Sequence, residues 1–405
     1  MSDRSIQMRH QTLLKHLKIL VDEIGERPTG SLLNRKAMEY IGKQLEDFGY
    51  PVMYQFFDCK DWKLLHASCR LNEHDIPVTA NPYSPPCTVR APFVTAGSRE
   101  ELRDADLSGK IAVLTGELSK EPLMPKNFEF YNPEEHREII RLLEEKEPLA
   151  VLFVTLGMRA VPVIVDGDFL LPSGTVGEDT GARIMREPSS ILDLTIDSTT
   201  EHTRAANVIT KTGGYSGEKI VLCAHFDTKF NTPGALDNAT GVAALLLLAE
   251  RFKGAPPGIP VEFVFFNGEE CYAIPGEMTY FDSGPDCLET ISLAINIDGI
   301  GLNGHNSSIA YFSCPTGIEK AVERARKRYP SLELVDPWPQ GDHMIFSLKG
   351  IPAIAISTHA EWSEIESVIH TEADIMDGVD LSKILQAVDA VEAMIREIKK
   401  VLQES

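Results

Sequence analysis

The residues of this chain best suited to chemistry are imidazoles and carboxylates that follow short apolar runs. The run KIVLCA leads to His225 and Asp227, VEFVFF leads to Glu269 and Glu270, and LAINI leads to Asp298. Imidazole and carboxylate groups are ligands that zinc accepts in proteins. These segments therefore indicate a possible metal-binding function, provided that the fold brings their ends together.

Two further candidate ligands come from loops. Asp237 lies in GALDNATG, just before an expected helix, and His370 follows the apolar run PAIAIS. Ligands of an open α/β sheet bind beyond the carboxyl ends of its strands. Taken singly, each residue has an ordinary explanation, such as a helix cap for Asp237 or a solvated turn for the acidic pairs. Their combination, in order, at the ends of successive expected strands indicates a site.

The chemistry of such a site needs these residue types. A catalytic zinc site keeps a position open for water, and two neighbouring metal ions need a carboxylate between them. The groups that suffice for two ions are His225, Asp237, Glu270, Asp298 and His370. Glu269 is then free to take a proton from water, and Asp227 can hold the His225 ring in one tautomer.

The elements that position these groups predict an α/β fold. Short, nearly all apolar runs are typical of strands covered on both faces. The expected strands are Ile220 to Ala224, Val261 to Phe266, Leu293 to Ile297 and Ala353 to Ile356. The expected helices are Gly241 to Phe252, Gly276 to Phe281, Gly317 to Arg328 and Leu381 to Leu402. This alternation predicts a mostly parallel central sheet flanked by helices.

Residues 61–198 differ in character from the rest. Short β-like runs at Lys110 to Leu114, Ala150 to Val154 and Val161 to Val165 alternate with proline-rich turns, and one charged helix is expected over Pro133 to Glu145. A chain of 405 residues exceeds the usual size of a single core. We interpret residues 61–198 as a smaller β-rich domain inserted into a catalytic domain made of residues 1–60 and 199–405.

The charge and composition exclude some partners. With 60 acidic and 39 basic residues the formal net charge is −21, which disfavours nucleic acid or an anionic membrane as a partner. The longest apolar stretch, Val242 to Ala249, is far below the roughly 20 residues that span a bilayer. The N-terminal MSDRSIQMRH does not resemble a signal peptide, and the 7 cysteines form no CxxC pair. We therefore expect reduced thiols and a cytoplasmic protein.

The motifs AHFDT, GALDNATG, NGEE, NIDGIG and IHTEAD resemble those of the M28 family of zinc aminopeptidases. The resemblance covers about residues 203–400, and the first 60 residues resemble the opening helices of the family. It implies that Asp237 bridges two zinc ions, that His225 and Asp298 complete one zinc site, and that Glu270 and His370 complete the other. Glu269 would be the general base, and a peptide the substrate.

Other segments fit the resemblance less closely. The layout of residues 61–198 resembles a protease-associated domain, and GDHMIFSLKGIPAIAIS resembles the stretch before the last ligand, which implies that Asp342 and His343 lie near the substrate. Some secreted relatives carry a tyrosine just before the last histidine, where this chain has Ile369. Either another donor or the metals themselves would then stabilise the oxyanion.

Several alternatives remain open at this stage. The same fold would suit a glutaminyl-cyclase-like acyltransferase, a carboxypeptidase or dipeptidase, or a receptor-like binding protein without activity. The complete ligand set and the DNATG context favour a hydrolase. Side-chain specificity, the choice between peptides and other amides, the role of the inserted domain and the oligomeric state, including a homo-oligomer, are left open.

Overall fold

The computed structural model describes residues 3–404, except 127, 129–130, 157–159, 214–217, 283 and 285–287. The chain divides into two compact units. Unit 1 comprises Met1–Cys59, Arg204–Glu270 and Pro275–Ser405, and unit 2 comprises Lys60–Thr203 and Cys271–Ile274. The borders expected at 61 and 198 fall inside the strands β1 (Met53–Leu71) and β8 (Ile191–Thr212), each of which runs from one unit into the other. A continuous strand leaves no turn in the sequence to mark the border.

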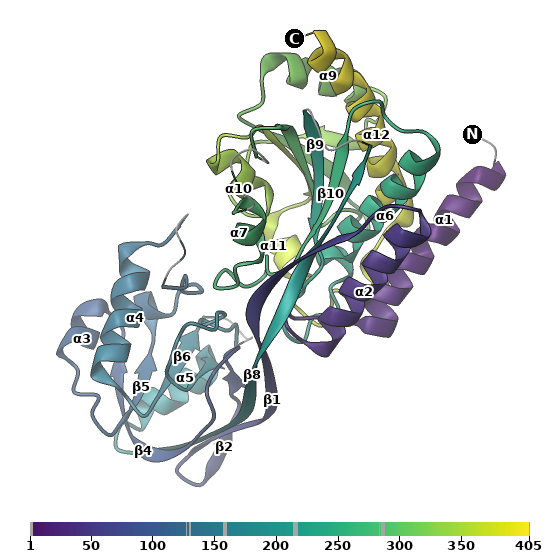
Figure 1. Ribbon diagram of the computed structural model, residues 1–405. Helices are drawn as coiled ribbons and strands as arrows, with labels where there is room; N and C mark the ends of the chain where they lie inside the picture. Colours follow the sequence, from purple (N-terminus) through teal and green to yellow (C-terminus); the bar gives the residue numbers. More distant parts are fainter. Residues whose placement is uncertain are drawn as a thin grey trace. The chain divides into compact units, whose positions relative to one another are not determined.

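The sheet of unit 1 is mostly parallel, as predicted (Figure 1). Its order is β13-β12-β14-β11-β9-β10-β8. Strands β9, β10, β11 and β14 are parallel to one another, whereas β8 pairs antiparallel with β10, and β12 with β14. The strands are β9 (Lys219–His225), β10 (Val261–Phe266), β11 (Ile291–Ile297), β12 (Asn306–Phe312), β13 (Leu332–Leu334) and β14 (Ala353–His359).

Helices cover both faces of this sheet (Figure 1). One face carries α1 (Asp3–Lys18), η1 (Ile19–Ile24), α2 (Leu32–Asp47), α6 (Thr240–Gly254), α9 (Thr316–Arg326) and α12 (Leu381–Glu404). The other carries α7 (Gly276–Phe281) and α10 (His343–Leu348), and the loops add η3 (Ala235–Ala239), α11 (Trp362–Glu366) and η4 (Met376–Gly378). Because α6 is buried along almost its whole length, its apolar residues surround it instead of forming one stripe.

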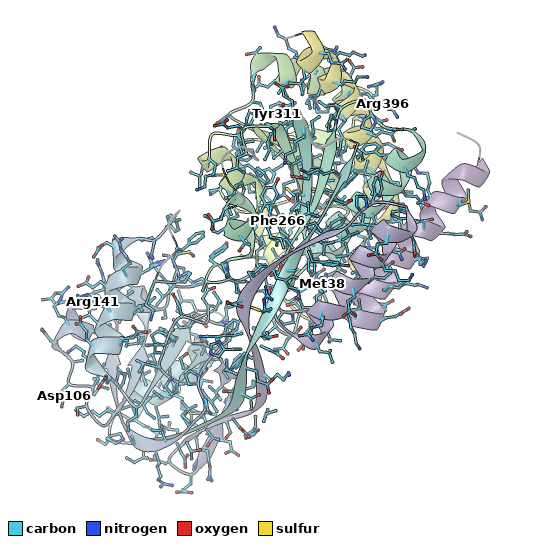
Figure 2. The ribbon with its side chains drawn as sticks, viewed as in Figure 1. Met38, Asp106, Arg141, Phe266, Tyr311 and Arg396 are labelled. Carbon is cyan, nitrogen blue, oxygen red and sulfur yellow. The ribbon has the colours of Figure 1, made fainter. Side chains whose placement is uncertain are left out.

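The strand order explains where a ligand can bind in unit 1. Strand β10 lies on one side of β9 and β11 on the other, so the direction of the connections reverses at β9. Such a reversal opens a crevice at the carboxyl ends of the strands. Phe266, labelled in Figure 2, ends β10 and packs edge-on against Tyr280, with ring centroids 5.4 Å apart. The chain beyond Phe266 is thereby fixed on an aromatic support.

Unit 2 contains helices among its strands. It comprises β2 (His74–Ile76), β3 (Thr79–Ala80), β4 (Cys87–Ala96), α3 (Arg99–Asp104), β5 (Ile111–Leu114), η2 (Gly116–Leu118), α4 (Glu134–Lys146), β6 (Ala150–Thr155), β7 (Ser173–Gly177) and α5 (Glu178–Arg186), with parts of β1 and β8. Strands β4 to β7 are successively parallel, and β3 pairs antiparallel with β7. Side chains of β5 alternate between two hydrophobic clusters, so this sheet is also covered on both faces.

One expected strand of unit 2 is wrong. Residues 161–165 form a loop, although Val163 and Ile164 are buried in the core of the unit. The Leu123 amide donates to the Val163 carbonyl at 2.9 Å, which satisfies that group outside a sheet. The apolar run thus predicted burial correctly but not the strand.

The helices of the described residues include none with the length and apolar character of a membrane-spanning segment.

Candidate metal centre

The residues that we predicted as ligands lie together at the carboxyl edge of the unit 1 sheet. His225 Nε2 is 3.0 Å from Asp237 Oδ1 and 3.4 Å from Asp298 Oδ1. His370 Nε2 is 3.0 Å from Asp237 Oδ2 and 3.1 Å from Glu270 Oε2. Ligand atoms of His225, Asp237 and Glu270 all lie within 4.8 Å of one another. Asp237 therefore offers one carboxylate oxygen to each imidazole.

Strand ends and tight loops bring these groups to one place. His225 is the last residue of β9, and Asp298 directly follows β11, with its amide donating to the Ile356 carbonyl of β14 at 2.9 Å. Glu270 comes a few residues after β10, and Asp237 lies within η3. His370 has a φ of 57°, a left-handed conformation that is uncommon for residues other than glycine. That conformation turns the loop after α11 at the position of the predicted ligand.

A buried carboxylate, Asp374, orients the segment that carries Asp237. Its oxygens accept the amides of Leu236 at 2.6 Å and of Asp237 at 3.1 Å. Burial and the nearby Asp237 raise the pKa of Asp374 to about 7. Our sequence reasoning missed this residue. The carboxylate in IHTEAD was a visible signal, but its partner lies far away in the chain.

Asp227 and Glu269 lie beside the predicted ligands. Glu269 Oε2 is 3.9 Å from His225 Nε2, and Asp227 Oδ1 is 3.6 Å from His225 Nδ1, which is longer than a hydrogen bond. Asp227 accepts the backbone amides of Glu269 at 3.3 Å and Glu270 at 3.2 Å, and the Thr29 hydroxyl at 3.1 Å. It therefore fixes the turn that carries both acidic residues, in addition to facing His225.

The charged groups of the cluster change one another's pKa values. Burial raises the pKa of Glu269 well above its usual range and that of Asp298 above its own, with neighbouring carboxylates adding to both shifts. Burial lowers the pKa of His370, but Glu270 and Asp237 outweigh it and raise it to about 10. Burial acts to raise the pKa of Asp237, but the two imidazoles outweigh this effect and lower the pKa below its usual range.

The residues fit a pair of zinc ions. Within the described part of the chain, both ring nitrogens of His225 and Oε1 of Glu270 are buried without a hydrogen-bond partner, although buried polar groups rarely lack one. The donors are imidazole nitrogens and carboxylate oxygens, which are common ligands of zinc in proteins. The exposed fractions of the His370 and Asp298 side chains are 44% and 26%, against 1% for His225. The cluster is therefore accessible to solvent on the side of His370 and Asp298.

The two residues of the GDHM segment are buried rather than part of a solvated loop. Burial and Glu277 raise the pKa of Asp342 well above its usual range, and the same burial raises that of Glu277 to about 8. His343 packs against Phe312, with ring centroids 4.3 Å apart, and its Nε2 lies 3.1 Å from the Trp338 carbonyl. Asp342 thus belongs to a buried acidic pair, whereas His343 is part of an aromatic cluster.

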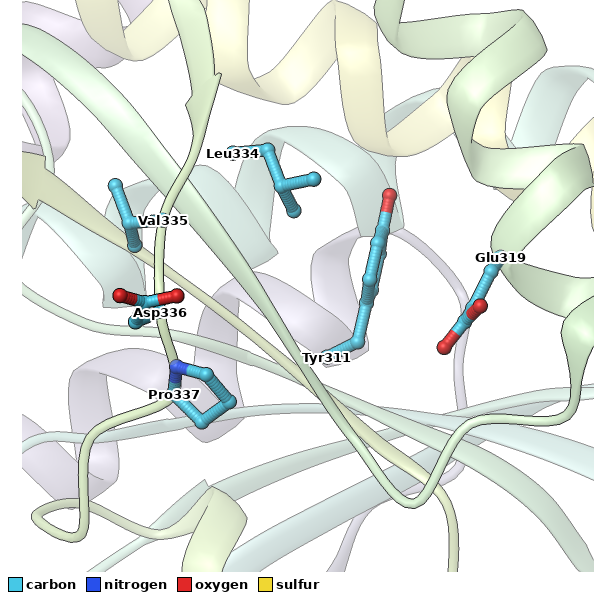
Figure 3. A pocket seen from close by; sticks show the side chains of 6 residues that line it. All are labelled: Tyr311, Glu319, Leu334, Val335, Asp336 and Pro337. Atoms are coloured by element: carbon cyan, nitrogen blue, oxygen red, sulfur yellow. The ribbon is translucent and has the colours of Figure 1, made fainter.

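A cavity of about 580 Å³ lies elsewhere in unit 1 (Figure 3). It is lined by Tyr311, Glu319, Leu334, Val335, Asp336 and Pro337. These residues come from β12, α9 and the segment that begins with β13, and none belongs to the metal cluster. The Tyr311 hydroxyl donates to Glu323 at 2.9 Å, so its polar end is already occupied. We assign no function to this cavity.

A mostly parallel α/β sheet with imidazoles and carboxylates at its carboxyl edge is the construction of a metal-dependent hydrolase. The model of Peptidase family M28 matches residues 207–395, just under half of the chain. The aminopeptidase YwaD of Bacillus subtilis is 22% identical over 417 residues, covering 98% of this chain and 87% of the relative. A probable leucine aminopeptidase 2 of Aspergillus fumigatus is 25% identical, covering 83% and 68%.

Solved structures agree on the fold. BSAP, a zinc aminopeptidase from Bacillus subtilis, superposes with a TM-score of 0.79 at 20% identity and covers 96% of this chain and 95% of its own. An aminopeptidase from Aneurinibacillus sp. strain AM-1 gives 0.75 at 21% identity, with 97% and 95% covered. The predicted fold class is thus confirmed, and the predicted family and enzyme class, an M28 zinc aminopeptidase, agree with the family model and with the names of these relatives.

Proposed function

We propose that this chain uses two zinc ions to hydrolyse the N-terminal peptide bond of peptides. The observation that carries the proposal is the position of Asp237, whose two oxygens each lie 3.0 Å from a different imidazole. A carboxylate shared in this way suits a bridge between two metals. The names of the relatives, all aminopeptidases in the comparisons above, support the reaction class.

The roles of the residues follow from this arrangement. His225 and Asp298 would hold one ion, Glu270 and His370 the other, and Asp237 both. Bound zinc supplies a Lewis acid and lowers the pKa of water. Glu269, next to His225, takes the proton of the attacking water and returns it to the leaving amine. Asp227 keeps Glu269 and Glu270 in place through their backbone amides.

The charge of the site supports a preference for free N-termini. Several carboxylates surround the cluster, and their mutual repulsion favours a substrate that brings a positive charge, such as an α-ammonium group. One cation of the chain already lies there, since the Lys229 ammonium is 3.5 Å from Glu270 Oε2. An N-acetylated peptide lacks the positive charge and should be a poor substrate.

The test is a panel of aminoacyl fluorogenic amides, assayed with zinc, with a chelator, and with zinc restored. We expect release of the N-terminal residue that the chelator removes and zinc restores, with about two zinc ions per chain in metal analysis. The matched control is the N-acetylated amide, which should remain intact. Formation of pyroglutamate from N-terminal glutamine without release of amino acids would instead indicate the acyltransferase, and release from the C-terminus a carboxypeptidase.

Two further assignments remain proposals. The interruption of the catalytic unit by a compact segment, Lys60–Thr203, supports a protease-associated-like domain at this point. The irregular spacing of the 7 cysteines, without a CxxC pair, supports a reducing compartment such as the cytoplasm, while Cys287 lies outside the described residues. Cell fractionation with an antibody against the chain tests the second assignment.

A further inference from the structure

Arg27 is a fully buried arginine next to the metal cluster, and our sequence analysis gave it no role. Its exposed fraction is 0%. The guanidinium donates to the backbone carbonyls of Phe226 at 2.6 Å, Pro233 at 2.8 Å, Gly234 at 2.9 Å, Gly25 at 3.0 Å and Leu20 at 3.3 Å. All five acceptors are neutral carbonyls, so the guanidinium serves as a hydrogen-bonding fork for the backbone.

These carbonyls belong to the two loops that present the proposed ligands of one metal. Phe226 directly follows His225, and Gly234 lies just before the segment that contains Asp237. The backbone amide of Arg27 also donates to Thr228 Oγ1 at 2.9 Å, which adds a second contact to the first loop. One side chain thus connects the loop of His225 with the loop of Asp237 and ties both to the first helical segment.

The packing around this fork is tight. Gly234 has a φ of +67°, and a Cβ there would come within 2.3 Å of Thr228 Cγ2, 2.7 Å of the Asp237 carbonyl and 3.2 Å of Arg27 Nη2. A shift of the guanidinium therefore moves the backbone on either side. Burial lowers the pKa of Arg27 to about 10, with Asp374, Asp227, Asp237 and Glu270 opposing the shift, so the group stays charged at neutral pH.

We infer that Arg27 is a positioning residue for metal binding: it sets the distance between His225 and Asp237, and with it the affinity for zinc. The inference rests on the metal site of the proposed function. A purely structural buried arginine would affect the stability of the fold but not the zinc affinity of the folded protein. Removing a group that orients metal ligands typically weakens metal binding by about ten- to a hundred-fold.

The test compares R27K with the wild-type full-length chain. Lysine keeps the charge but has three donors on one atom, so it cannot reach five carbonyls in a fork. Zinc affinity is measured by competition with a chromophoric chelator, well below the unfolding temperature, with circular dichroism to establish folding. We expect R27K to be folded and to bind zinc about ten-fold more weakly, and R27M to bind more weakly still, so that lysine partly rescues the loss.

The matched control is R251K. Arg251 is another largely buried arginine of unit 1, paired with Asp389 and Glu392 at 2.8 Å, away from the cluster. It should lose stability without losing zinc affinity. If R27K fails to fold, T228V serves instead, because it removes the acceptor of the Arg27 amide and leaves the guanidinium. We expect zinc binding by T228V to be several-fold weaker.

Wild-type zinc affinity in folded R27K, or in T228V where R27K does not fold, would overturn the inference. Failure of the proposed function has a different result. In that case the wild-type chain binds no zinc, or binds it and releases no amino acids, whatever residue occupies position 27.

Discussion

Strands β9 and β10 carry a group of buried charged residues at each end, and the two groups differ in whether their charges are balanced. At the amino ends, Glu262 lies 2.8 Å from Lys219 and 2.7 Å from Lys211, and accepts the Tyr280 hydroxyl at 2.6 Å. At the carboxyl ends, His225 and Glu270 lie in a cluster with an excess of carboxylates. At the amino ends, lysines of the chain thus balance the buried carboxylate. At the carboxyl ends, the buried carboxylates outnumber the cations of the chain.

The difference shows how a buried structural charge can be told from a functional one. Burying a charge is unfavourable unless partners and hydrogen bonds compensate for it. The Glu262 group is complete, because its lysines lower the pKa of the carboxyl against the effect of burial. The other group leaves ring nitrogens and a carboxylate oxygen without partners within the described residues. A divalent cation would compensate for the second group, and the first needs none.

Of the changes that test this difference between the two ends, removal of the metal should have the largest effect. A chelator should abolish activity, because the proposed chemistry depends on zinc at the carboxyl ends. The free energy of unfolding should also fall, by about 2.7 kcal/mol relative to zinc at a hundred times its dissociation constant. Activity assays and thermal unfolding with and without restored zinc measure both. Undiminished activity in the metal-free protein would contradict the assignment.

The substitution E269Q should reduce kcat by about 10²- to 10⁴-fold, because the amide cannot take the proton of the attacking water. Zinc content and unfolding temperature should stay close to those of the wild type, since Glu269 is not a proposed ligand. The matched control is the same replacement at the other end of β10, E262Q, which should leave kcat unchanged. Full activity of zinc-loaded E269Q would remove Glu269 from its role.

The substitution E262Q should act on stability alone. It removes the negative charge that Glu262 places beside the buried Lys219 and the partly buried Lys211, and breaking a buried ion pair typically costs about 3–5 kcal/mol. Denaturant unfolding at neutral pH measures the loss, and chelator competition should show wild-type zinc affinity. A change of zinc affinity in the folded variant would mean that the two ends of the strands are coupled.

The smallest of these effects concerns His16, a buried imidazole whose Nδ1 lies 2.6 Å from the Tyr40 hydroxyl oxygen. Burial, with a contribution from Lys15, lowers the pKa of His16 to about 4, whereas carboxylates raise that of His370. Between pH 6.5 and 4 the unfolded chain takes up a proton at His16 and the folded chain does not, so stability falls as the pH falls through this window. The total is at most about 3.4 kcal/mol at 1.36 kcal/mol per pKa unit.

The variant H16Q should remove this contribution. Its unfolding free energy should fall less steeply than that of the wild type between pH 6.5 and 4, and in parallel with it above pH 7. Denaturant unfolding across this range is the measurement. Equal slopes for the two proteins would show that His16 is not kept neutral in the fold.

Much of the fold was visible in the sequence because the relevant signals are local. The expected strand at Val261 to Phe266 and helix at Gly276 to Phe281 agree with β10 and α7 in both bounds. Strand β7 was missed because its sequence, SGTVG, is neither strongly apolar nor β-branched throughout. The border at residues 271–274 was also missed, since it depends on long-range contacts such as the Ala273 amide with Asp166 at 2.9 Å.

By itself, the sequence determined which side chains come to the carboxyl edge. His225, Glu269, Glu270 and Asp298 end apolar strands or follow them within a few residues, and a parallel sheet aligns such positions whatever the rest of the chain does. The tertiary structure alone decided which oxygen of Asp237 faces which imidazole, and that Arg27 joins the two loops. Those contacts join residues up to about two hundred positions apart, and only the packed fold sets their distances.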